Sequence, residues 1–132
     1  MYGFSVGQKG EFGEIEQRVV AALKTEGFGI LSEIDVQAAM KEKLGEEIPR
    51  YKILGACNPP LALQAIQAEP DIGLLLPCNV VVREDDDGAV TVSFMDPESV
   101  LTLVDRDDVA ELAVEVKGRL LRVKLVLEQQ NG

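Results

Sequence analysis

Apolar residues recur along this chain at spacings that change between those of helices and those of strands. A stripe with helical spacing begins at Phe12 and ends before Gly27, and polar or charged residues separate its members. A longer stripe runs from Val109 to Leu127, with acidic side chains in its first turns and basic ones in its second half. That order of charges suits the helix dipole. Both segments are therefore predicted to be amphipathic helices.

Two residues of the longer helix carry expectations of their own. Asp105 precedes the apolar stripe and is predicted to cap the helix N-terminus. Gly118 lies in the helix interior, where glycine costs about 1 kcal/mol relative to alanine. We therefore expect another segment to pack closely against this glycine.

Five shorter segments are rich in β-branched and aliphatic residues, as strands are. They lie around 4–6, at 28–34, at 51–57, at 72–84 with a break at Pro77, and at 89–95. The turn Asp85–Gly88 joins the last two as a hairpin, and 96–99 is predicted to break the chain again. Asp35 and Asn58 each predict the start of a short helix, and the first of these ends at Gly45.

The predicted order is β-α-β-(α)-β-(α)-β-β-α. It predicts a two-layer α+β domain in which one antiparallel-rich sheet carries its helices on one face. We expect a single domain over residues 1–128 and a polar tail at 129–132.

Charge and composition limit the partners of such a domain. The 132 residues include 13 basic and 23 acidic side chains, which give a net charge of −10. Nucleic acid is an unsuitable partner, since its phosphates require clustered Lys and Arg. The chain has no histidine, which excludes Ser-His-Asp and Cys-His catalysis and histidine general bases. We therefore expect no catalytic residue and no cofactor.

The N-terminal residues and the two cysteines bear on the compartment. The first seven residues have neither the basic nor the apolar region of a signal peptide. The longest apolar runs are far shorter than the ~20 residues of a membrane span. Two cysteines without an export signal indicate reduced thiols, and we expect a cytoplasmic protein without membrane contact.

Two Cys-Asn pairs are the candidate site. Cys57 ends a predicted strand just before a helix, so unpaired helix N–H groups are expected to lower its thiol pKa. Cys78 begins another strand and is followed by Asn79, as Cys57 is followed by Asn58. If the strands are neighbours, both thiols and both amides converge on one pocket at the strand ends.

The same residues allow plainer interpretations. Free cysteine is often buried simply as a small apolar side chain, and Asn58 is already accounted for as a helix cap. Two cysteines without histidine supply too few ligands for zinc, so we expect no metal there. The acidic turn Asp85–Gly88 lacks the twelve-residue ligand pattern of a calcium loop and is predicted to be a solvated turn.

Several short motifs of this sequence resemble those of an uncharacterised bacterial and archaeal family, domain-of-unknown-function family 302. They are 34–36 with 43–45, Tyr-Lys-Ile-Leu-Gly-Ala-Cys-Asn-Pro at 51–59, Leu-Leu-Pro-Cys-Asn-Val-Val-Val at 75–82, and Met-Asp-Pro at 95–97. The resemblance spans roughly residues 3–126. It implies a fold similar to that of the TATA-box-binding-protein class, a curved antiparallel sheet with two main helices, and it implies no activity.

Two functions follow from the residues. The leading hypothesis is a small binding module for a small molecule or a protein partner, in the form of a homodimer, with its pocket near Cys57 and Cys78. The valine-rich strand at 80–82 is the predicted association edge. The alternative is a thiol-dependent redox enzyme or sensor in which the two cysteines cycle between dithiol and disulfide.

Overall fold

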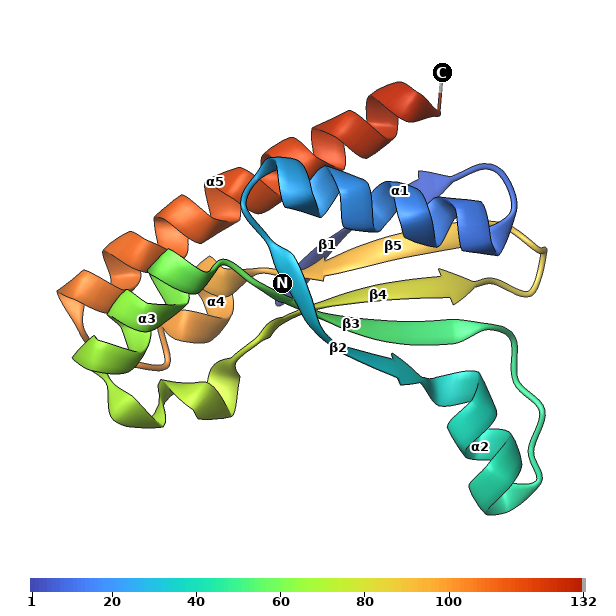
Figure 1. Cartoon of the computed structure of the whole chain (residues 1–132), viewed down its shortest axis with the longest axis horizontal. Coiled ribbons are helices and arrows are strands. Elements are labelled where there is room, and N and C mark those ends of the chain that lie inside the picture. The colour runs from blue at the N-terminus through green and yellow to red at the C-terminus, as the bar shows by residue number, and fades with distance from the viewer. Residues whose placement is uncertain (132) are drawn as a thin grey trace.

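Five strands form one antiparallel sheet, and helices cover one of its faces (Figure 1). The computed structural model describes residues 1–131. The elements are β1 (Gly3–Gln8), α1 (Phe12–Thr25), β2 (Gly29–Asp35), α2 (Val36–Leu44), β3 (Tyr51–Cys57), α3 (Pro59–Ala68), the 3-10 helix η1 (Pro70–Leu75), β4 (Cys78–Glu84), β5 (Val90–Met95), α4 (Pro97–Leu101) and α5 (Asp107–Gln130). The spatial order of the strands is β1-β5-β4-β3-β2, with every neighbouring pair antiparallel. The predicted α+β class is confirmed.

The main core lies between the sheet and the helices α1 and α5. The predicted stripe of α1 is buried here, and the Glu11 side chain caps this helix by accepting bonds from the N–H groups of Gly13 and Glu14. Burial of these side chains is the principal stabilisation of the fold, at about 1.5–3 kcal/mol for each large one. The fully buried large members include Ile15, Leu23, Leu54, Val80, Val82, Val92, Phe94 and Leu120.

A second, smaller core cluster lies beyond the end of the sheet, where α3, η1, α4 and the first turns of α5 meet. Its buried members are Ala65, Ile72, Leu101, Val109 and Ala113. The apolar stripe of α5 thus serves both clusters, its first half in the small one and its second half in the main core. Figure 1 shows α5 extending along the whole molecule from the α3–α4 end to the C-terminus.

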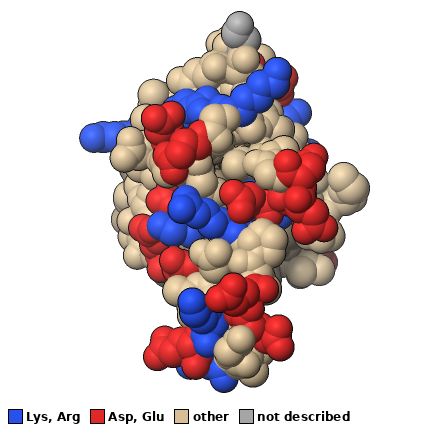
Figure 2. Space-filling model, turned by 90° about the vertical axis from the view of Figure 1, so that its right-hand side faces the viewer, with Lys and Arg blue, Asp and Glu red and all other residues tan. Residues whose placement is uncertain are grey.

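Helix α2 differs from the others because it projects from the end of β2, away from α1 and α5 (Figure 1). The predicted caps are confirmed: the Asp35 side chain accepts a bond from the Ala38 N–H, and Gly45 takes the left-handed conformation at φ +68°. All nine residues of α2 are described, and none of them is buried. Figure 2 shows this end of the molecule as a narrow lobe that carries both acidic and basic side chains.

Two predicted strand features are wrong. The segment from Ile72 is not a strand: residues 70–75 form η1, and β4 begins at Cys78. A short apolar run has no period that separates a strand from a buried helix, and Pro70 suits a first helical turn. The valines at 80–82 are not an association edge, because β4 is hydrogen-bonded to β3 on one side and to β5 on the other.

Helix ends account for the remaining differences. The predicted chain break at 96–99 is the start of the short helix α4, capped by the Asp96 side chain. Asp105 does not cap α5; the N-cap is Arg106, which makes no side-chain cap bond.

The interior and the end of α5 also depart from the predictions. Among residues 1–131, no other segment packs closely on Gly118, where an added Cβ would lie 3.8 Å from the Arg122 side chain. The predicted tail is helical as far as Gln130, and Gly132 lies outside the described residues. Within residues 1–131, no helix combines the length and hydrophobicity needed to cross a bilayer.

Candidate functional site

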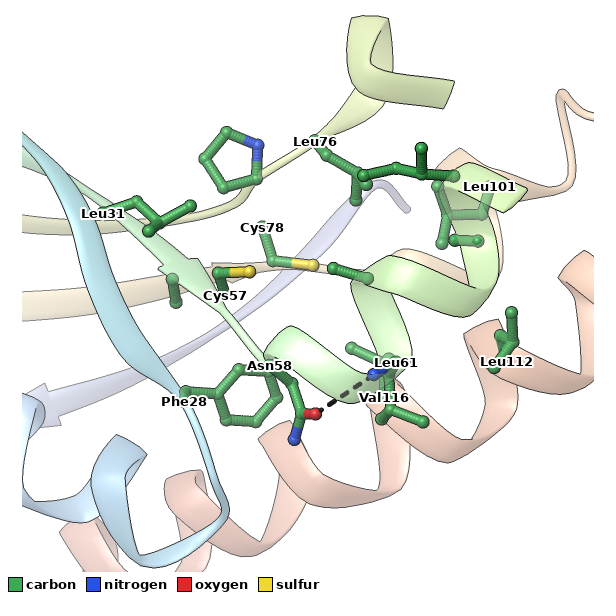
Figure 3. Close-up of a pocket in the computed structure, with 15 residues that line it drawn as sticks. Phe28, Leu31, Cys57, Asn58, Leu61, Leu76, Cys78, Leu101, Leu112 and Val116 are labelled. Atoms are coloured by element: carbon green, nitrogen blue, oxygen red, sulfur yellow. Dashed lines mark hydrogen bonds between the residues drawn. The ribbon is translucent and has the colours of Figure 1, made fainter. Parts of the chain in front are cut away.

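The two cysteines come together because β3 and β4 are neighbours. Ala56 is the register partner of Cys78, so Cys57 and Cys78 are diagonal neighbours at this end of the sheet. Figure 3 shows both sulfur atoms directed into the same space, beside the start of α3. Because the two strands are neighbours, the two thiols lie beside the same pocket, as predicted for that case.

That space is a pocket of about 230 Å³ between the main core and the small cluster. Strands β3 and β4 form its base, α3 and α5 form walls, and residues next to η1 and in α4 close the far end (Figure 3). Its apolar lining comprises Phe28, Leu31, Ala56, Leu61, Ala62, Ala65, Ile66, Leu76, Pro77, Leu101, Leu112 and Val116. Cys57, Asn58 and Cys78 complete the lining, and no charged residue among those described takes part.

The mouth of the pocket lies at an irregularity in the edge strand β2. The register against β3 shifts between Ile30 and Ser32, so Leu31 is the extra residue of a bulge. Its side chain is 69% exposed and yet lines the pocket, which places it at the rim. A bulge of this kind re-aims a side chain, here towards the end of the sheet.

Burial controls the chemistry of both thiols. Burial, together with the nearby Cys57 sulfur, raises the pKa of Cys78 to about 12. Burial also raises the pKa of Cys57, so the predicted lowering is wrong. The cause is loss of hydration in the half-buried position of Cys57 beside the apolar pocket lining, which disfavours the charged thiolate. At neutral pH both side chains are protonated and behave as soft apolar groups.

Asn58 is buried and its polar atoms are used within the fold. Its Oδ1 accepts a bond from the Leu61 N–H at 3.4 Å, which confirms the predicted cap of α3. Its Nδ2 donates to the backbone oxygen of Glu26 at 3.3 Å. The same oxygen accepts a bond from the Arg119 guanidinium at 3.0 Å, so three segments meet at one carbonyl. Both polar atoms of Asn58 therefore bond within the fold, and the residue holds the start of α3 against the turn after α1.

Asn79 does not join the pocket. It is exposed and lines a separate hollow on the opposite face of the sheet, together with Tyr51 and Ser93. Successive residues of a strand point to opposite faces, and Asn79 accordingly faces away from the side on which Cys78 lies. The two-residue period of a strand therefore predicts that Cys78 and Asn79 lie on opposite faces of the sheet.

Sequence reasoning did not identify the helical walls of the pocket. The sequence pattern places Leu112 and Val116 on the apolar stripe of the long helix, Leu61 in a short helix and Phe28 in a strand, and none of these patterns indicates a pocket. The only sequence signal was the length of the α5 stripe, which exceeds what one sheet face can cover. The turn at 85–88 remains structural: Asp85 accepts a bond from the Thr91 hydroxyl at 2.7 Å and pairs with Arg83.

Metal ligands of the usual kind are missing from the described part of the chain. Residues 1–131 contain no group of three or more Cys, Asp or Glu side chains placed to hold a metal ion. The pocket can therefore act through shape, dispersion contacts and the two soft thiols. Such a site suits a neutral, apolar molecule.

Comparisons with known proteins agree with the fold. The crystal structure of an uncharacterised conserved protein DUF302 from Bacillus stearothermophilus is similar, with a TM-score of 0.88 and 26% identity, over 96% of this chain and 98% of that chain. No curated protein matches the chain. The family model described as "Domain of unknown function DUF302" matches residues 4–124. This match covers nearly the whole fold, and the chain therefore belongs to the DUF302 family.

Proposed function

We propose that this protein is a non-enzymatic binding module for a small, neutral, apolar molecule held in the pocket beside Cys57 and Cys78. The observation that carries the proposal is the pocket itself, about 230 Å³ of space lined by aliphatic and aromatic side chains. A cavity of roughly 150 Å³ lined by such side chains stays dry and accepts benzene. The space here suits a somewhat larger molecule, such as one with two fused rings.

The lining also limits the chemistry of the ligand. The described lining residues include no Lys, Arg, Asp or Glu, so a charged group inside would lose its hydration without gaining a partner. The thiols stay protonated near neutral pH because burial raises the pKa of each. Reduced thiols fit a reducing compartment, and we propose the cytoplasm as the place of action.

Naphthalene is a suitable probe, and binding is followed by amide chemical shifts in the full chain. We expect saturable shifts at Ala56, Cys57, Ala65 and Val116. Ala62→Phe places a ring in the half-buried pocket wall and should abolish them. Ala21→Phe makes the same change on the exposed side of α1 and should leave them intact. Shifts that are absent, or that persist in Ala62→Phe, contradict the proposal.

A second candidate is dithiol–disulfide cycling, which the meeting of the two cysteines in one pocket favours. The raised pKa of each thiol opposes it, because the thiolate is the species that attacks a disulfide. Incubation with oxidised glutathione, followed by intact-mass measurement, separates the two. A binding module keeps both thiols free at neutral pH, whereas a redox protein loses two hydrogen atoms and forms the Cys57–Cys78 bond.

A further inference from the structure

The sheet face opposite α1 and α5 is an uncovered surface whose side chains can be read from the register. Residues that alternate with the buried ones point to it. They are Gly3, Ser5 and Gly7 of β1; Thr91, Ser93 and Met95 of β5; Asn79, Val81 and Arg83 of β4; Tyr51 and Ile53 of β3; and Ser32 and Ile34 of β2. We name this set the open face.

A row of apolar side chains crosses the open face. Ile34 is the register partner of Ile53, and Ile53 is the partner of Val81, so three β-branched side chains lie side by side on β2, β3 and β4. The row continues into Ser93 and Ser5, whose hydroxyls bond to each other at 2.8 Å. An antiparallel sheet that faces water normally carries polar residues at such positions. This row is therefore suited to contact with another apolar surface.

The open face also lacks free charge, although the chain has a net charge of −10. Among the strand positions described on this side, only Arg83 is charged, and it is paired with Asp85. Nucleic acid would find no free cation here, and a basic protein no free carboxylate. The surface fits a partner that is itself uncharged and apolar where it touches.

We infer that the partner is a second copy of this chain, packed open face to open face about a two-fold axis. Two copies carry −10 each, and contact through their acidic surfaces would bring like charges together. The open face is a region where two copies can approach without that cost. A two-fold axis places the same patch on both partners, so the Ile34–Ile53–Val81 row meets its own copy.

Helix α2 bears on the surface area that two copies of the chain can bury between them. Five strands about 4.8 Å apart, with six or seven residues rising about 3.4 Å each, give a face of roughly 500 Å² in projection. A stable interface buries about 800 Å² on each partner. Isolated helices shorter than about 12 residues are marginal in water, and α2 has nine residues with none buried in its own chain. The open face alone falls short of this area, so we infer that residues beside the sheet, such as the exposed side chains of α2, also contact the second copy.

This inference concerns a different surface from the pocket and does not depend on the pocket's ligand. It is tested by light scattering with size exclusion at micromolar to submillimolar concentration. The wild type should be a dimer. Val81→Lys places two ammonium groups in the interface and should raise the dissociation constant by about a hundredfold or more. Leu125→Lys, on the exposed side of α5, should leave the dimer intact.

The double change Ile53→Thr and Val81→Thr keeps β-branched residues in the strands and guards against a folding defect. It should weaken the dimer while the far-ultraviolet circular dichroism and the thermal midpoint stay near those of the wild type. A wild-type monomer throughout the concentration range overturns the inference. So does a dimer that survives Val81→Lys, because it must use another surface. Naphthalene binding in these variants reports separately on the pocket.

Discussion

The main core and the small cluster are both apolar, but side chains fill the main core more completely than they fill the small cluster. In the main core, α1, α5 and the sheet bury many large side chains from four strands and two helices. The small cluster has five buried members, two of them alanines, and a pocket of about 230 Å³ opens beside it. Both share α5 and both are apolar, so composition does not distinguish them. Stability is concentrated where packing is complete, and space for a ligand is found where it is not.

The largest effect should come from truncating the shared helix inside the main core. Leu120→Ala removes a fully buried side chain from a region with little freedom to collapse, and should lower the free energy of unfolding by about 3–4 kcal/mol. Urea denaturation measures this loss. Leu121→Ala is the matched control on the same helix, because that residue is 42% exposed, and it should cost less than about 1 kcal/mol. Equal losses in the two variants would contradict the assignment of the core.

A smaller loss is expected for the same kind of change in the small cluster. Ile72→Ala should cost about 2 kcal/mol, near the lower limit for such truncations, because η1 can move towards the adjacent pocket. It should also weaken naphthalene binding, which Leu120→Ala should not do under conditions where both are folded. Leu74→Ala, on the exposed side of η1, is the control and should change neither quantity. Unweakened naphthalene binding in Ile72→Ala would separate the small cluster from the pocket.

The smallest effect is expected from pH, through the thiol at the boundary of the two regions. The pKa of Cys78 is about 12 in the folded chain, against 9.0 for an unperturbed thiol. The folded state therefore holds this proton more tightly, and its contribution to stability is complete below pH 9 and declines as the pH rises towards 12. By pH 10 the decline should reach about 1 kcal/mol.

Cys78→Val keeps an apolar side chain of similar size and removes the titrating group. Its unfolding free energy, followed between pH 8 and pH 10, should fall by less than that of the wild type. Parallel profiles for the two proteins would show that the Cys78 thiol ionises as readily in the folded chain as in the unfolded one.

A structural feature of this protein could be predicted from the sequence when it depends on residues close together in the chain, and not when it depends on distant ones. The stripes of α1 and α5, the caps at Asp35 and Asn58, and the antiparallel α+β class follow from local pattern and are confirmed. The strand prediction for residues 72–75 is wrong because an apolar run of that length fits a strand and a buried helix equally well. The interior position of β4 depends on strand order, which no local pattern specifies.

The pocket was predicted in part for the same reason. The meeting of Cys57 and Cys78 required only that two strands be neighbours, and they are. The walls supplied by Leu112 and Val116 depend on where α5 crosses the end of the sheet, a long-range property. The thiol pKa was predicted in the wrong direction because burial is a tertiary property, whereas proximity to a helix start can be read locally.

The strand order has a consequence for the order of events on the ribosome. β1 pairs with β5 and not with β2, so the first strand to emerge must wait for the last before its backbone groups find partners. At roughly 5–20 residues per second, the synthesis of the intervening segment takes several seconds. During that interval the strands available for pairing are β2, β3 and β4, and β1 can join the sheet only after β5 has been made.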